Sequence, residues 1–145
     1  MTATQASSLV ILAEIPQLTT TLVANAVYEF SAYITFRSAA TTTGINLGFS
    51  APLGSRPMLE IVVPIVSTAS SNALSLRFPS GINTITGSVL GTGVTAANLD
   101  HTARIIGTIV TGGLGGNFQI QFASEVTLSA ITLQVGSTIT MTRIE

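Results

Sequence analysis

Apolar and polar residues alternate along much of this chain, and this alternation predicts β-strands. Between residues 27 and 37 every second side chain is apolar, and most of the side chains between them are polar. A period of two is typical of a strand with one buried face. We expect further strands wherever short apolar or alternating runs recur, at residues 45–50, 58–66, 73–78, 103–110, 118–122, 126–128, 131–135 and 138–144.

Glycine-rich segments separate several of these predicted strands. Residues 112–116 are mostly glycine and lie between two alternating runs, which predicts a β-hairpin. Gly136 and Ser137 separate the last two runs, and we expect a second hairpin there. Residues 87–100 carry glycines among small side chains, so we expect a long loop with one helical turn at 95–99.

The strand pattern predicts an all-β fold. No segment repeats apolar residues at helical spacing, and Thr, Val and Ile favour a pleated surface. Eight or nine short strands predict an antiparallel β-sandwich, with a jelly roll as its specific form. A chain of 145 residues fits one domain, which we place at residues 23–145. Residues 1–22 lack a clear alternation and are expected to form an extended N-terminal arm or edge segment.

Composition excludes several classes of function. Charged residues make up 8% of the chain and apolar residues 46%, which is not the composition of a disordered protein. The five basic residues are scattered arginines and the net charge is -1, so we expect no nucleic acid partner. No run of about 20 apolar residues is present, so we expect no membrane helix. Without Cys or Lys the chain has no disulfide, thiol nucleophile or Schiff-base lysine.

Candidate catalytic and metal-binding residues are few. Asp100 and His101 are adjacent, but nothing marks an activated serine, so we interpret His101 as a surface or capping residue. One His and no Cys do not make a zinc site within one chain, which leaves open only a site shared by three copies. The glycines of residues 87–93 are not followed by the lysine of a phosphate-binding loop. We therefore expect no enzymatic activity, no cofactor and no metal.

The surface predicts a homo-oligomer. Few charges are available to keep this chain soluble, and residues 58–66 and 105–110 are apolar on both predicted strand faces. Such strands in a small domain indicate a face that meets another subunit. Glu125 is an isolated charge between apolar segments, and two interpretations remain open. It is either a solvated corner or the partner of an arginine at a subunit contact.

Two blocks of the sequence carry a family resemblance: residues 28–45, and the stretch from Arg104 through 111–113, 122–126 and 136–137 to Ile144. They resemble a β-rich domain found in structural proteins of tailed bacteriophages. The resemblance implies a protein of the head decoration or of the tail or fibre, commonly a trimer. The family blocks carry no catalytic motif.

For a chain of this length, the resemblance implies a capsid decoration or cement protein. It would bind the major capsid protein of the assembled head, bridge neighbouring capsomers, and lie on the outer surface of the virion after synthesis in the host cytoplasm. The expected docking or subunit-interface residues are Leu9, Val10, Ile11, Leu12 and Glu125. We expect deletion through Pro16 to abolish docking and to spare the fold.

Two other functions remain open. The first is a tail-associated or fibre module that binds a host receptor or glycan, with Tyr33 and Asp100 as exposed side chains at loop tips. The second is an enzyme or adhesin with a jelly-roll fold. A sandwich fold alone does not separate these classes, because all three occur on it.

Overall fold

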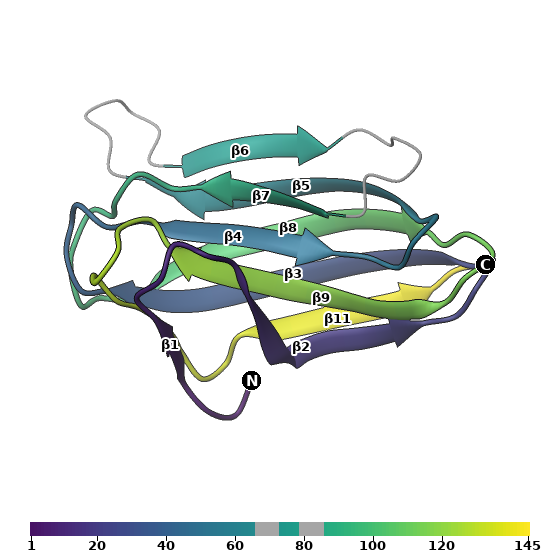
Figure 1. The fold of residues 1–145 in the computed structure, drawn as a ribbon, viewed down its shortest axis with the longest axis horizontal. Coiled ribbons are helices and arrows are strands. Elements are labelled where there is room, and N and C mark those ends of the chain that lie inside the picture. Colours follow the sequence, from purple (N-terminus) through teal and green to yellow (C-terminus); the bar gives the residue numbers. More distant parts are fainter. Residues whose placement is uncertain (66–72, 79–85) are drawn as a thin grey trace.

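The protein is a sandwich of two β-sheets (Figure 1). The computed structural model describes residues 1–65 and 86–145, together with the backbone of 73–78. These residues contain no helix, and every strand pair among them is antiparallel. The strands are β1 (Gln5–Ser7), β2 (Ala13–Leu22), β3 (Val27–Ser38), β4 (Ile45–Ser50), β5 (Arg56–Pro64), β6 (Ala73–Phe78), β7 (Thr86–Leu90), β8 (His101–Val110), β9 (Gly116–Ser124), β10 (Ile131–Leu133) and β11 (Thr138–Arg143).

The strand order is that of a jelly roll. One sheet runs β1-β10-β3-β8-β5-β6, with β11 also pairing with β3, and the other runs β2-β9-β4-β7. Without β5, β6 and β11, two four-stranded sheets remain, β1-β10-β3-β8 and β2-β9-β4-β7, and the chain crosses from one to the other at every step except from β4 to β7, as in a jelly roll. The predicted antiparallel sandwich is therefore confirmed. The additional pair β5 and β6 extends the first sheet beyond β8.

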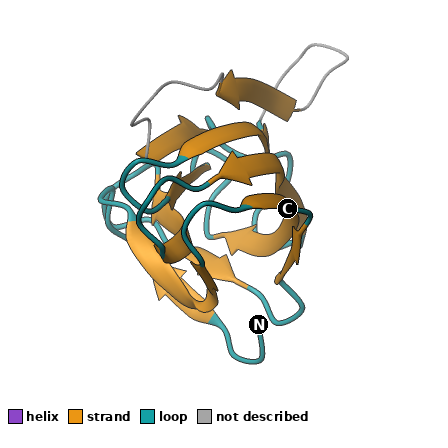
Figure 2. Ribbon diagram, turned by 90° about the vertical axis from the view of Figure 1, so that its right-hand side faces the viewer, coloured by secondary structure: helices purple, strands orange, loops and turns teal. Residues whose placement is uncertain are grey.

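The core lies between the two sheets, which Figure 2 shows in a second view. In β3, alternate residues from Tyr28 to Phe36 are buried, as their spacing predicts. From the other sheet, Phe118 on β9 brings its ring to 4.8 Å from that of Phe30, measured between ring centroids. Burying each such side chain contributes about 1.5–3 kcal/mol, which makes this interleaving the main source of stability.

The predicted hairpin around residues 112–116 is wrong. β8 and β9 belong to different sheets, so the glycine-rich segment carries the chain across the sandwich. β8 already has β3 on one side and β5 on the other, which leaves no edge for β9. Gly112 is needed for a close approach, because a Cβ there would lie 2.7 Å from the Gly54 carbonyl oxygen.

The second predicted hairpin is also wrong. β10 and β11 do not pair with each other but lie in line along the same edge of β3, β10 beside its end and β11 beside its start. The segment around Gly136, which has a φ of 96°, does not reverse the chain but interrupts its pairing with β3 between β10 and β11. Residues 126–128 form a turn and not the expected strand. The expected long loop at 87–100 is shorter than predicted, because β7 occupies its first residues, and residues 95–99 form a turn and not a helical turn.

Residues 1–22 lie at the edges of both sheets and are not a free arm. β1 borders the seven-stranded sheet, and β2 is the edge strand of the four-stranded sheet. Ile15, Leu18 and Leu22 of β2 are fully buried in the core. The strand pairing is irregular between Glu14 and Thr19, and this bulge hides the period of two in the sequence. A deletion through Pro16 would remove Ile15, so it would not spare the fold.

Candidate functional site

Four loops gather at one end of the sandwich, on the left in Figure 1, and we call this the loop end. They are residues 8–12 between β1 and β2, 39–44 between β3 and β4, 91–100 between β7 and β8, and 125–130 between β9 and β10. In a jelly roll the alternation of the chain between sheets places these four connections together. The loop end therefore brings together residues from both halves of the sequence.

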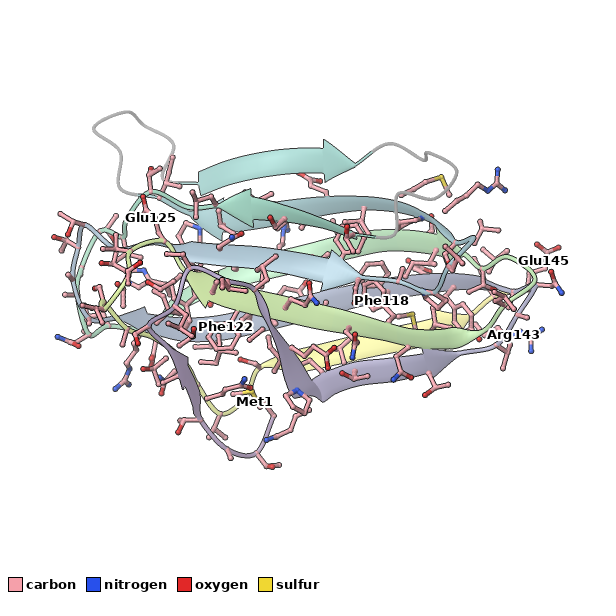
Figure 3. All side chains as sticks on the ribbon, in the orientation of Figure 1. Met1, Phe118, Phe122, Glu125, Arg143 and Glu145 are labelled. Atoms are coloured by element: carbon pink, nitrogen blue, oxygen red, sulfur yellow. The ribbon has the colours of Figure 1, made fainter. Side chains whose placement is uncertain are left out.

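The Glu125 carboxylate ties three of these loops together (Figure 3). Its Oε2 atom accepts hydrogen bonds from the backbone N–H of Gly44 at 2.7 Å and of Gly93 at 3.0 Å. The Glu125 N–H donates in turn to the Gly44 carbonyl at 3.0 Å. A Cβ on Gly44 would lie 1.9 Å from the Gly91 carbonyl oxygen, so only glycine allows the loops to approach this closely.

Buried hydroxyl groups fix the same loops. Ser38 Oγ donates to the Thr43 carbonyl at 2.7 Å, and Ser124 Oγ donates to the Ser129 carbonyl at 2.6 Å. The hydroxyls of Thr43 and Ser129 lie 2.6 Å apart and join the loop 39–44 to the loop 125–130. Hydrogen bonds inside a loop compensate for the loss of water by its polar groups. The loop end is therefore a bonded frame.

Large aliphatic side chains point outward from this frame. Leu9, Val10 and Ile11 are 59%, 48% and 75% exposed, and Val126 and Leu128 are 41% and 88% exposed. The two loops that carry them are joined, because Ser124 N–H donates to the Leu9 carbonyl and Leu128 N–H to the Ser8 carbonyl, each at 2.9 Å. We call these five side chains the apolar loop patch. Exposed apolar side chains on adjoining loops are typical of a surface that contacts another molecule.

Leu128 also has an unfavourable backbone conformation. Its φ is 67°, in the left-handed region that bulky residues rarely adopt. This conformation costs a non-glycine residue about 1–2 kcal/mol, and an exposed side chain recovers none of that cost by packing. Strain of this kind is concentrated at functional positions. Leu128 is therefore the residue of the patch whose presence is hardest to explain by folding alone.

An arginine–aspartate pair lies at the same end of β3. Arg37 Nε donates to Asp100 Oδ1 at 2.6 Å and Nη2 to Oδ2 at 3.2 Å, with both side chains about half exposed. The hydrogen bond from Arg37 lowers the pKa of Asp100, and Asp100 raises the pKa of Arg37. Beside the pair is a pocket of about 340 Å³, lined by Thr4, Arg37, Ser38, Ala39, Asn98, Ala130, Thr132 and Gln134.

His101 and Tyr33 are not part of a reactive cluster. His101 Nε2 lies 2.7 Å from the Ala96 carbonyl oxygen, and its ring contacts Phe36. Tyr33 is half exposed in the middle of β3, opposite Arg104 and Thr138, so it does not lie at the loop tip expected for a receptor-binding aromatic. Of the two residues suggested for receptor binding, only Asp100 borders a loop.

The structure brings most of the predicted docking residues to one end. Leu9, Val10 and Ile11 lie on the same loop end as Glu125, whereas Leu12 is half buried and turns toward Gly48 of β4. Glu125 is not a solvated corner, because its carboxylate binds loop amides. Sequence reasoning missed Val126 and Leu128 as surface residues, because a short run containing Val, Thr and Leu is also typical of a strand.

The described part of the chain shows neither a metal cluster nor a membrane helix. Within residues 1–65 and 86–145, no three His, Asp or Glu side chains gather as a metal site requires. The described residues also hold no helix that could cross a membrane.

Comparisons with known proteins return no family. No family model and no curated protein sequence matches the chain. Among solved structures, the VP2 subviral particle of infectious bursal disease virus is similar with 9% identity and a TM-score of 0.31, over 100% of this chain and 40% of that chain. The structure of the Gx strain of the same virus gives 12% identity and a TM-score of 0.28, over 97% of this chain and 37% of the other. The chain thus spans well under half of either protein.

Proposed function

We propose that the chain is a structural protein of a virus particle, and specifically a decoration protein that binds the assembled head of a tailed phage through its loop end. The observation that carries the proposal is the apolar loop patch held outward on a hydrogen-bonded frame. The jelly roll, which viral capsid proteins and lectins share, supports the class by analogy. The sequence resemblance to phage structural proteins supports the choice of a phage head and its major capsid protein.

The physics of the patch fits binding to a preformed lattice. Burial of its five aliphatic side chains would contribute about 1 kcal/mol each, because each side chain is already partly covered. Because the loops are already fixed, little conformational entropy is lost on docking. A protein that binds the assembled shell and not its free subunits stabilises the shell by mass action. The proposed role is mechanical and needs no catalytic residue.

A sedimentation experiment tests the docking surface. Purified chain is mixed with undecorated heads of the phage that encodes it, and the fraction that sediments with the heads is measured. We expect the double variant Ile11→Ser, Leu128→Ser to lose affinity by about tenfold or more, because two anchoring side chains are removed. The matched control is Leu53→Ser, Leu114→Ser, since these leucines are 59% and 58% exposed in loops 51–55 and 111–115 at the opposite end.

The outcomes separate clearly. Co-sedimentation of the wild type and the control, with loss for the loop-end variant, supports the proposal. Absence of the chain from purified particles, or equal binding by both double variants, would overturn it.

A receptor-binding or glycan-binding module is the second candidate. It is favoured by the pocket beside Arg37 and Asp100, whose volume of about 340 Å³ lies at the low end of the range for small-molecule sites. Its lining offers guanidinium, amide and hydroxyl groups, which suit a polar, hydroxyl-rich ligand. Glycan binding that is lost in Asp100→Ala and retained in Ile11→Ser, Leu128→Ser would favour this function over decoration.

A further inference from the structure

β11 presents an open edge. Among the described strands it pairs only with β3, in a regular register from Thr138 opposite Tyr33 to Arg143 opposite Tyr28. In an antiparallel strand every second residue directs its N–H and C=O away from such a single neighbour. These groups form a row that a further extended chain can pair with. Figure 1 shows β11 in yellow in the lower part of the sandwich, with β2 of the other sheet running below it.

The neighbouring edges are protected and β11 is not. β2 carries Pro16 and a bulge, and the Gln5 side chain donates to its Glu14 carbonyl at 3.1 Å. β1 has only three residues. Short length, proline and bulges are the devices by which proteins prevent edge pairing. β11 has six residues, no proline and no bulge, and its single charge is Arg143 at its end. On the opposite side of the sandwich, β6 and β7 adjoin residues outside the described ranges.

The core is incompletely covered along this edge. Ile139 and Met141 pack against the core but are only partly buried, and the three threonines that alternate with them, Thr138, Thr140 and Thr142, are exposed. Met1 already pairs with the two residues that precede β11. Its carbonyl accepts a hydrogen bond from the Gly136 N–H, and its amino group donates one to the Ser137 carbonyl. Figure 3 labels Met1 in the lower part of the molecule. Beyond Ser137 no described residue continues that pairing.

We propose that this edge is filled by β11 of a second copy of the chain, antiparallel about a two-fold axis at Thr140. The strand is its own complement: this register places Thr138 opposite Thr142 and Ile139 opposite Met141, and keeps threonines on one face and apolar residues on the other. A register centred on Met141 would instead place Arg143 opposite Ile139. In this register the paired residues run from Thr138 to Thr142 in each copy, and the two copies of Arg143 lie at opposite ends of the pair, away from each other.

The symmetry has a direct consequence for the number of copies. A two-fold interface uses the same surface on both subunits and closes at two. It therefore predicts a dimer, where the phage resemblance predicts a trimer. The interface uses the edge of the sheet and leaves the loop end free, so it does not depend on the proposed decoration role.

A charge exchange at Thr140 tests this interface. In the proposed pair residue 140 faces its own copy, so Thr140→Lys and Thr140→Glu each place two like charges opposite each other. We expect a wild-type mass of twice 14.9 kDa by light scattering over a dilution series. In each variant the dimer dissociation constant should rise about fivefold or more, and an equimolar mixture of the two variants should restore the pair. Thr102→Lys is the matched control, an exposed threonine on β8 in the interior of the same sheet.

Each result bears on the proposal. Loss of the dimer in both variants, restoration on mixing and an unchanged control support it. A monomeric or trimeric wild type, or variants that dimerise as the wild type does, would overturn it. Circular dichroism checks that residue 140 variants are folded, which we expect because the side chain is exposed. The chain alone is measured, so failure here is distinct from failure to bind heads, and the loop-end variant should keep the wild-type mass.

Discussion

Removal of the Glu125 carboxylate should loosen the loop end and lower the stability of the whole domain. Glu125→Ala leaves the N–H groups of Gly44 and Gly93 without their acceptor. A hydrogen bond to a charged group is worth about 1.5–3 kcal/mol when buried, and Glu125 is only half buried, so water replaces part of each bond. We expect a loss of about 2 kcal/mol in the free energy of unfolding. Glu125→Gln keeps an oxygen that can accept both bonds, so we expect about 1 kcal/mol or less.

Two measurements check this prediction. Urea unfolding followed by circular dichroism gives the free energy, since the chain has no Trp for fluorescence. Amide hydrogen exchange at Gly44 and Gly93 reports the two bonds directly, and protection should fall in Glu125→Ala. The control is Glu14→Ala, which removes an exposed carboxylate from β2. If Glu125→Ala is no less stable than this control, or if the two glycine amides stay protected, the carboxylate does not hold the loops and the reasoning is refuted.

Two further predictions concern strain and charge. Leu128→Gly relieves the backbone strain at a φ of 67°, so it should leave the free energy of unfolding unchanged or raise it by up to about 1 kcal/mol, and it should weaken binding to heads. Thermal unfolding measures the first effect and sedimentation with heads the second. A large loss of stability would contradict the inference that Leu128 is strained. Because Arg37 lowers the pKa of folded Asp100 below its ordinary 3.8, the stability that the pair contributes is present above that pH and is lost as the pH falls through the folded value. The free energy of unfolding of the wild type, measured with urea, should therefore fall more steeply below about pH 4 than that of Asp100→Asn, and high salt should reduce the difference between the two proteins. Parallel curves of free energy against pH at low salt would contradict this prediction.

The sequence predicted strands better than their partners. β3 was clear because its twelve residues have one face in the core, and burial imposes the period of two. β2 was missed because its bulge breaks that period after Glu14. Both hairpins were wrong for one reason. Glycines at 112–116 and at 136 mark where the chain can bend, but which sheet it enters next depends on which edges are free, and that is decided by strands far away in the sequence.

The candidate site was predictable only in part. Leu9, Val10 and Ile11 were suggested because they fit no strand, and they are exposed. Val126 and Leu128 were assigned to a strand because of their residue types. They are exposed because they lie in a turn, which the hydrogen bond from the Ser124 hydroxyl to the Ser129 carbonyl closes, and the sequence pattern does not show that bond. The role of Glu125 depends on two glycines more than thirty residues away from it, and no local pattern carries that information.

The pairing of the first strands with the last ones also determines when this protein can fold. β1 pairs with β10, and β2 pairs with β9, so the partners of residues 5–22 are about a hundred residues further along the chain. On the ribosome β1 and β2 emerge before their partners and stay unpaired until β9 and β10 have been made. Contacts this distant are slow to form, and the unpaired segment carries Leu9, Val10 and Ile11, so newly made chains are most prone to aggregate just before β9 and β10 emerge.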